Sequence, residues 1–175
     1  MLVEEALEAL ALRPGGLYVD ATFGRGGHSA RILQALAPDG ELVAIDRDPA
    51  AIAAGRARFA GETRLQLVHG EFAELATLVH AHTTRTLCDG ALFDFGVASP
   101  QLDDAARGFS FGKDGPLDMR MDPTRGQAVA LWLQHAGLDE IRHVIATLGE
   151  ERFANRIAAE IVRARTAQPL TRTSE

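Results

Sequence analysis

The chain has 175 residues, which is enough for one or two domains with a sizeable core. Its 46% hydrophobic and 24% charged residues are typical of a globular protein, and its net charge of −6 argues against broad, non-specific binding to nucleic acid. The sequence has no apolar run of the roughly 18 residues that a membrane span needs, and its single cysteine, Cys88, excludes an intrachain disulfide. We therefore expect a cytoplasmic protein with no membrane segment.

The first half of the chain alternates between helical and strand patterns, beginning with an amphipathic helix over residues 3–10. Asp48, followed by Pro49, is a good N-cap for a later helix. This alternation predicts a parallel sheet covered by helices on both faces. Strands are expected at 17–22, 42–46, 65–69 and 91–95, and the helices between them at 27–37, 49–59 and 72–81.

The pattern changes after residue 99. Residues 108–126 are rich in Gly, Asp and Pro and lack periodicity, and so long a loop is usually functional or disordered. Its Asp118, Arg120 and Asp122 are candidates for a substrate or lid role, and Met119 and Met121 are expected to anchor it in the core. Helical patterns follow at 127–136, 139–148 and 150–165.

The most informative segment is VDATFGRGGHS, in which an apolar run ends at Asp20 and passes into a turn with Gly24, Gly26 and Gly27. A helical pattern follows at once, so the segment predicts a strand, a tight turn and a helix N-terminus that lets bare backbone approach a ligand. Asp46 ends the next apolar run, at the strand tip where a nucleotide ribose is usually bound. The two features together predict a nucleoside cofactor.

The turn departs from the dinucleotide fingerprint G-x-G-x-x-G because Ser29 occupies its sixth position. Asp20 lies before the turn, where a carboxylate would face an ammonium group rather than a pyrophosphate. S-adenosylmethionine carries an ammonium group and a ribose diol, which match Asp20 and Asp46. A nicotinamide dinucleotide remains an alternative, and so does a strand–turn–helix with a purely structural role.

The fourth expected strand ends in a further group of polar residues. Asp94 would lie at its carboxyl end, in the crevice where open α/β sheets bind ligands, and the Ser99-Pro100-Gln101 turn follows it. A hydrogen-bond acceptor there could hold the exocyclic amine of a base in line with a sulfonium methyl group. Asp94 is a candidate for that role or for holding the cofactor, with Ser99 and Pro100 as further catalytic candidates. Cys88 precedes the strand and is expected to be a small buried residue.

We expect no metal site, because His80 and His82 have no further ligand nearby in the sequence and amine methylation needs no metal. Arg156, Arg163 and Arg165 are candidates for RNA phosphate contacts, and a solvated helix face is the alternative for each of them.

Five segments of the chain carry a resemblance to a known family, and they are, in order, VDATFGRGGHS, AIDRDP, FDFGVASPQLD, RGFSFGKDGPLDMRMDPTRG and GEERFANRIAAEIVRAR. The chain resembles the bacterial 16S ribosomal RNA cytosine-N4 methyltransferase family over essentially its whole length. The resemblance implies a class I, Rossmann-like methyltransferase core with an inserted helical domain, which acts on a cytosine in the decoding region of the small ribosomal subunit.

The resemblance also implies S-adenosylmethionine as the cofactor and 16S rRNA as the partner, and a homodimer is one option for the assembly. An aromatic ring at Phe72, just after the third strand, could pack against the adenine. The cofactor residues implied by the family are Gly26, Gly27, His28, Asp46, Phe72, Asp94 and Gln101.

We expect the N-terminal part of a cofactor-binding core at 1–107, a functional loop at 108–126 and an incomplete helical insert at 127–175. The fourth strand, placed beside the first, would leave one edge unpaired, and the sequence supplies no later strand to cover it. In addition, Ala98 stands where the family has serine. We therefore expect a shortened member of the family, and a non-catalytic remnant that binds cofactor, RNA or another protein is the alternative.

Overall fold

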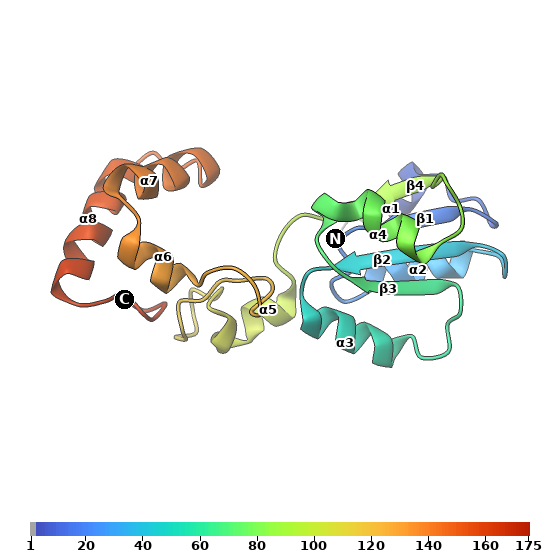
Figure 1. Cartoon of the computed structure of the whole chain (residues 1–175), viewed down its shortest axis with the longest axis horizontal. Helices are drawn as coiled ribbons and strands as arrows, with labels where there is room; N and C mark the ends of the chain where they lie inside the picture. Colours follow the sequence, from blue (N-terminus) through green and yellow to red (C-terminus); the bar gives the residue numbers. More distant parts are fainter. Residues whose placement is uncertain (1–2) are drawn as a thin grey trace. The chain divides into compact units, whose positions relative to one another are not determined.

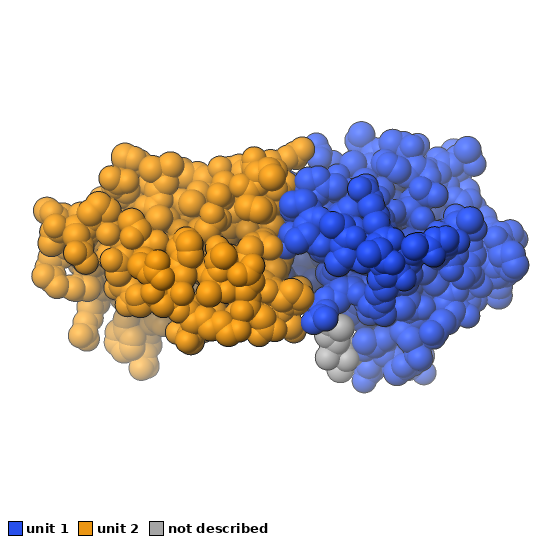
Figure 2. Space-filling view, turned by 90° about the horizontal axis from the view of Figure 1, so that it is seen from below, with its two compact units in different colours: residues 1–96 blue, residues 97–175 orange. Residues whose placement is uncertain are grey.

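The computed structural model describes residues 3–175. The chain divides into two compact units, residues 1–96 and residues 97–175, which are coloured separately in Figure 2. Each unit has its own hydrophobic core. Among the described residues, no helix is both long enough and apolar enough to cross a bilayer.

The first unit contains a four-stranded sheet in the order β3-β2-β1-β4 (Figure 1). All three neighbouring pairs are parallel, with Val19 of β1 opposite Val43 of β2 and Ala91 of β4. The predicted parallel sheet, with its fourth strand beside the first, is therefore confirmed. The strands are β1 (Leu17–Asp20), β2 (Glu41–Asp46), β3 (Leu65–His69) and β4 (Gly90–Leu92).

Helices cover both faces of this sheet because the strands are apolar on both sides. On one face, Tyr18, Leu42 and Ala44 pack with side chains of α1, α2 and α3. On the other face, Val19 and Val43 pack with α4. The helical segments are α1 (Val3–Leu10), α2 (Gly27–Ala35), α3 (Pro49–Arg58), the short 3₁₀ turn η1 (Phe72–Glu74) and α4 (Leu75–His82).

The loops at the amino ends of the strands are held together by Arg85. Its guanidinium donates to the carboxylate of Glu41 at 2.9 Å and to the carbonyl oxygens of Gly15 and Asp39, each at 2.7 Å. Arg85 thus joins its own loop, before β4, to the loops before β1 and β2, which are distant in the sequence.

The expectation that Cys88 is buried is wrong, because this side chain is exposed. The reason is that β4 begins only at Gly90, so Cys88 lies in the loop before the strand. In the described part of the chain β4 pairs with β1 alone, and its Ala91 is exposed.

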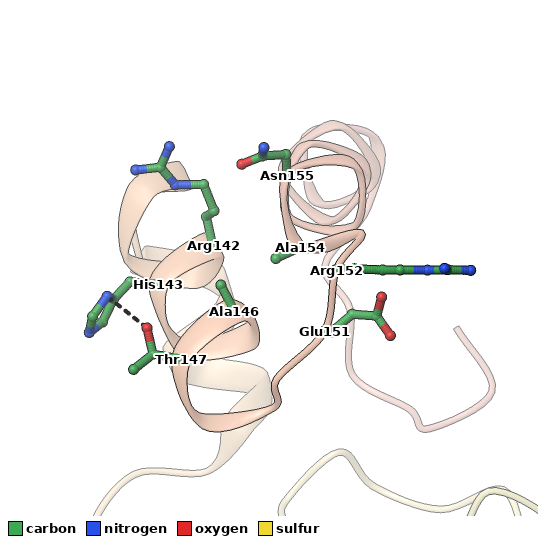
Figure 3. A pocket seen from close by; sticks show the side chains of 8 residues that line it. All are labelled: Arg142, His143, Ala146, Thr147, Glu151, Arg152, Ala154 and Asn155. Carbon is green, nitrogen blue, oxygen red and sulfur yellow. Dashed lines mark hydrogen bonds between the residues drawn. The ribbon is translucent and has the colours of Figure 1, made fainter.

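The second unit is helical, and its core consists of Leu133, Ala136, Ile141 and Ala158. The π-helical segment η3 follows α7 directly, and these two pieces and α8 border a groove (Figure 3). The elements are α5 (Ser99–Asp103), the 3₁₀ turn η2 (Ala105–Arg107), α6 (Val129–His135), α7 (Leu138–His143), η3 (Val144–Leu148) and α8 (Ala154–Ala167).

The long loop of this unit is tied to the last residues of the chain. Pro116 and Arg172 form an antiparallel bridge, and the backbone N–H of Thr173 donates to the carbonyl oxygen of Gly115 at 3.0 Å. The Arg172 guanidinium also pairs with Asp114 at 2.6 Å. Residues 171–175 therefore form a clasp on the loop.

Candidate functional site

The glycine turn connects the end of β1 to the start of α2. It is held at Phe23, whose backbone N–H donates to Ile45 of β2 at 2.9 Å and whose carbonyl oxygen accepts from Gly26 at 2.7 Å. Gly24 and Gly26 have φ angles of +54° and +69°, which an L side chain rarely adopts. The turn therefore depends on glycine for its backbone shape.

The two glycines differ in the space around them. A Cβ added at Gly26 would lie 2.7 Å from the ring of Phe23 and 2.8 Å from that of Phe59, so this position is closed by packing. A Cβ added at Gly24 would meet only the carbonyl oxygen of Thr22, at 3.9 Å. The turn thus leaves open space beside Gly24. A ligand that approaches the backbone closely needs such space.

Asp46, at the carboxyl end of β2, is bound directly to this turn. Its Oδ2 accepts from the backbone N–H of Gly24 at 2.7 Å, and its Oδ1 accepts from that of Asp48 at 2.8 Å. Burial raises the pKa of the Asp46 carboxyl, and these two hydrogen bonds oppose that shift. Each oxygen keeps a lone pair that could accept from a hydroxyl of a ribose diol.

Asp20, at the end of β1, is fully buried. Its carboxylate accepts from the hydroxyl of Ser29 at 2.6 Å and from the backbone N–H of Thr22 at 3.2 Å. Burial raises its pKa, and the Ser29 hydrogen bond is the strongest opposing influence. In this conformation Asp20 binds the turn to α2, and its contact with an ammonium group remains a prediction.

Gly27 and His28 begin α2, and the His28 side chain is buried. Because the first turn of a helix has unpaired backbone N–H groups and a partial positive charge, this end suits a carboxylate or another anion. The amino-acid end of S-adenosylmethionine carries such a carboxylate. The predicted residues Gly26, Gly27 and His28 therefore lie where they could hold it.

Asp94 lies just beyond β4, and its position depends on Thr22. The backbone N–H of Asp94 donates to the Thr22 hydroxyl at 2.8 Å, and Thr22 in turn donates its own N–H to Asp20. Asp94 is exposed. Thr22 therefore joins the tips of β1 and β4, a role that the sequence analysis missed although this small hydroxyl residue lies in the quoted glycine-turn segment.

Three phenylalanine rings lie beside one another near Asp94. Phe72 packs edge-on against Phe93 and Phe95, with ring centroids 6.1 and 5.5 Å away. All three rings are partly exposed, and Phe95 is the most open at 72%. This cluster offers an aromatic surface on which a planar ring such as adenine could pack.

The other three predicted site residues belong to the second unit. Ser99 and Pro100 are exposed at the start of α5, whereas Gln101 is buried. The side-chain oxygen of Gln101 accepts from the backbone N–H of Ala98 at 2.9 Å, so it stabilises the start of this short helix.

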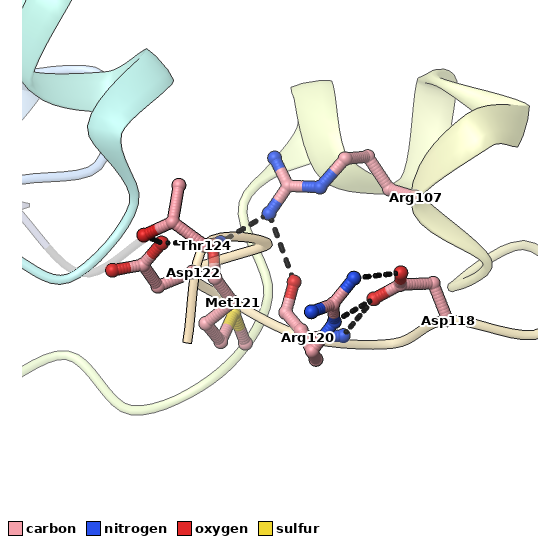
Figure 4. Close-up of polar contacts among 6 residues, drawn as sticks. All are labelled: Arg107, Asp118, Arg120, Met121, Asp122 and Thr124. Atoms are coloured by element: carbon pink, nitrogen blue, oxygen red, sulfur yellow. Dashed lines mark hydrogen bonds and ion pairs between the residues drawn. The ribbon is translucent and has the colours of Figure 1, made fainter. Parts of the chain in front are cut away.

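Charged residues of the long loop are paired within the second unit (Figure 4). Arg120 contacts Asp118 at 2.7 Å and lowers the pKa of its carboxyl, while Asp122 is buried and accepts from the Thr124 hydroxyl at 2.6 Å. The guanidinium of Arg107 donates to the carbonyl oxygens of residues 120 and 121. The loop is thus internally braced, and its substrate or lid role remains a prediction.

Met119 does not anchor the loop as expected. Its side chain is 43% exposed, and its φ of +60° is unusual for a residue other than glycine. The backbone explains this difference, because the Met119 N–H is held by the carbonyl oxygen of Arg107 at 3.0 Å. The loop is therefore fixed through backbone hydrogen bonds rather than through this apolar side chain.

Two of the arginines considered for RNA binding already have partners. Arg165 donates to the carbonyl oxygens of Leu133 and Ala136, so it caps the C-terminal end of α6. Arg163 pairs with Glu160 one turn earlier on α8. Arg165 therefore has a structural role, whereas the exposed pair of Arg163 is typical of a solvated helix face.

Comparison with solved structures finds partial matches to several methyltransferases. A putative rRNA methylase from Clostridium thermocellum is 18% identical, with a TM-score of 0.47, and the alignment covers 55% of this chain and 52% of that one. A SAM-dependent methyltransferase from Aquifex aeolicus is 18% identical, with a TM-score of 0.36 and coverage of 40% and 38%. The C-terminal domain of precorrin-6Y C5,15-methyltransferase from Rhodobacter capsulatus is 21% identical, with a TM-score of 0.42 and coverage of 66% and 59%.

The alignments thus span between 38% and 59% of the length of these solved chains. The comparison with protein families is more specific, because the model of the MraW methylase family matches residues 1–175. The parallel sheet, the glycine turn and the family match agree: this chain belongs to the MraW methylase family.

Proposed function

We propose that this chain binds S-adenosylmethionine and serves methylation of the exocyclic N4 of a cytosine in the decoding region of 16S ribosomal RNA. The observation that carries the proposal is the hydrogen bond between Asp46 and Gly24, which joins the carboxylate proposed to bind the ribose to an open glycine turn. Membership of a methylase family over the whole chain supports the same conclusion.

In this proposal the N-terminal turn of α2, with Gly26, Gly27 and His28, holds the amino-acid end of the cofactor. Asp46 accepts from the ribose hydroxyls, and the Phe72 ring packs against the adenine. Asp20 supports the turn by accepting hydrogen bonds from Ser29 and Thr22. When bound, the cofactor supplies an electrophilic sulfonium methyl group.

Asp94 is the proposed acceptor for the amine of the target base, or else a ligand of the cofactor. Its carboxylate is exposed while its backbone is held by Thr22, so it can contact a ligand from a fixed position. The target cytosine would have to leave its stack to reach it. Ser99, Pro100 and Gln101 remain candidates for contacts near the transferred methyl group.

Calorimetric titration tests the cofactor assignment. We expect binding of S-adenosylmethionine and none of NAD, and a lower affinity in Asp46→Ala. Asp39→Asn is the matched control, because this exposed carboxylate lies in the same unit, outside the site. Binding of NAD alone would support a nicotinamide-dependent oxidoreductase instead.

Methyl transfer is tested separately, with small ribosomal subunits from cells that lack the modification. Transfer of a labelled methyl group to N4 of a cytosine supports the proposed reaction. Cofactor binding without any transfer would support the non-catalytic alternative. A cytoplasmic location, the small subunit as partner and a homodimer belong to the proposal, and sedimentation of the chain tests the last.

A further inference from the structure

Thr22 holds the segment that follows β4 at an unusual point of the sheet. The ladder between β1 and β4 extends to the bond from the Ala21 N–H to the Leu92 carbonyl oxygen, at 2.9 Å. Two residues later along β4, the N–H of Asp94 donates to the side-chain hydroxyl of Thr22, at 2.8 Å. A side chain thus takes the place of a main-chain carbonyl at the residue that is a candidate for the reaction.

The position of Asp94 depends on this contact because little else fixes its polar groups. Its carboxylate accepts no hydrogen bond from the part of the chain that the structure describes. Among residues 3–175, no backbone-to-backbone hydrogen bond involves residues 95–97. Gly96 has a φ of +147°, and a Cβ added there would meet no atom within 4 Å. The backbone directly after Asp94 is therefore free of close restraints.

Thr22 is also bound to the cofactor turn. Its N–H donates to Oδ1 of Asp20 at 3.2 Å, and Oδ2 of Asp20 accepts from the Ser29 hydroxyl of α2 at 2.6 Å. Asp20 is fully buried and Thr22 is half-buried, so water competes little for these bonds. A continuous chain of three hydrogen bonds therefore runs from the first turn of α2 to Asp94.

We propose that Thr22 is a positioning residue, which couples occupancy of the cofactor turn to the position of Asp94. The inference rests on the proposed function, in which α2 holds the amino-acid end of S-adenosylmethionine. A ligand that binds only the closed turn stabilises the bonds of Ser29 and Asp20, and through Thr22 it restrains Asp94 as well. Such restraint matters for methyl transfer, because misplacing a reacting group by about 1 Å can lower a rate by roughly 100-fold.

The aromatic cluster allows this hydrogen bond to be removed by itself. Phe93 and Phe95 flank Asp94 in the sequence, and both rings pack against Phe72. In Thr22→Val these ring contacts remain, while the Asp94 N–H loses its acceptor and the N–H of residue 22 still reaches Asp20. Thr22→Ser keeps the hydroxyl and is the conservative variant.

Hydrogen exchange of the Asp94 amide, measured by NMR with and without saturating S-adenosylmethionine, tests the coupling. In the unmodified chain the cofactor should slow this exchange by about tenfold or more, because it binds only the closed turn. In Thr22→Val the exchange should be faster, and the cofactor should no longer slow it. Thr22→Ser should restore the slowing. A merely structural role of Thr22 predicts faster exchange that the cofactor still slows by the original factor.

The matched control is Thr83→Val, which removes a hydroxyl that donates to Glu41 at 2.6 Å, at the amino ends of the strands. It should leave the exchange of the Asp94 amide and its response to the cofactor unchanged.

Calorimetry on the same proteins separates this inference from the proposed function. If the unmodified chain binds no S-adenosylmethionine, the proposed function fails and the coupling fails with it. If the chain binds the cofactor and Thr22→Val keeps the full slowing of Asp94 exchange, only the coupling through Thr22 is overturned.

Discussion

Asp46 and Gly24, 22 positions apart in the sequence, are joined by a hydrogen bond of 2.7 Å from the glycine N–H to the carboxylate Oδ2. This contact holds the tip of β2 to the turn after β1, and Asp46 also accepts from Asp48 at the start of α3. The same carboxylate that would bind a ribose therefore shapes the turn that would hold the rest of the cofactor.

The first prediction contrasts the two glycines of this turn. Gly24→Ala places a Cβ in open space and should cost about 1–2 kcal/mol, because an L residue is strained at this φ, while it lowers cofactor affinity by obstructing the site. Gly26→Ala forces a Cβ against two aromatic rings and should cost a further 1–3 kcal/mol or so. Urea unfolding and calorimetric titration of both variants check this. Equal stability of the two variants would contradict the close packing of Phe23 and Phe59 around Gly26.

The second prediction concerns Thr22. In Thr22→Val the backbone N–H of Asp94 loses its acceptor, and we expect the stability of the first unit to fall by about 0.5–1.5 kcal/mol. Thr22→Ser keeps the hydroxyl and should retain the hydrogen bond. Hydrogen exchange of the Asp94 amide reports directly on this contact, and an unchanged exchange rate in Thr22→Val would argue against it.

The third prediction concerns Arg85, which joins three segments at the amino ends of the strands. Arg85→Ala should lower the free energy of unfolding by about 1–3 kcal/mol, because Glu41 and two carbonyl oxygens lose their donor. Arg13→Ala is the matched control, since the side chain of Arg13 is 79% exposed in its pair with Asp89. Urea unfolding of both variants separates them. If both variants lost the same free energy of unfolding, the Arg85 contacts would contribute no more than the exposed pair of Arg13.

The fourth prediction is a pH dependence with a defined sign. Arg64 lowers the pKa of Glu62 from 4.5 to about 2 through a side-chain hydrogen bond, and it also caps α2 by donating to the carbonyl oxygens of Leu33 and Leu36. Because the folded-state pKa is depressed, this contribution is present above pH 4.5 and is lost as the pH falls toward 2.

Glu62→Gln should therefore make stability less dependent on pH in that acid range, while the stability at pH 7 falls. Chemical unfolding at several pH values measures both effects. Asp39→Asn, an exposed carboxylate of the same unit, serves as the control and should leave the acid dependence as it is. If Glu62→Gln lost stability in acid as steeply as the unmodified chain, the contribution assigned to Glu62 would be refuted.

The fifth prediction tests the clasp on the long loop. Lys113 is the only lysine of the chain, so a lysine-specific protease has a single cleavage site, next to Asp114. Arg172→Ala removes the ion pair with Asp114 and should speed this cleavage several-fold, because proteolysis follows local opening. Arg163→Ala, which removes an exposed ion pair with Glu160 on α8 outside the loop, should not. Equal rates in the two variants would show that the clasp does not hold the loop.

Much of the fold follows from local sequence patterns. Alternating apolar segments predicted the parallel sheet and the place of its fourth strand, and the Asp48–Pro49 pair predicted the start of α3, where the Asp48 side chain accepts from Ala50. The third strand lies at residues 65–69 as expected. These features depend on neighbouring residues, so one sequence suffices to recognise them.

What the tertiary structure alone decided depends on contacts between residues far apart in the chain. The Thr22 hydroxyl meets Asp94 across 72 positions, and Arg165 caps a helix that ended 30 positions earlier at His135. Burial likewise depends on how segments pack, which is why Cys88 proved exposed and Asp20 fully enclosed. The sequence by itself determined the order of the strands, most of the longer helices and the glycine turn through local periodicity and turn chemistry, but it did not indicate the short helix α5 or the π-helical segment η3. Which polar groups are paired and which face a groove was decided only when distant segments came together.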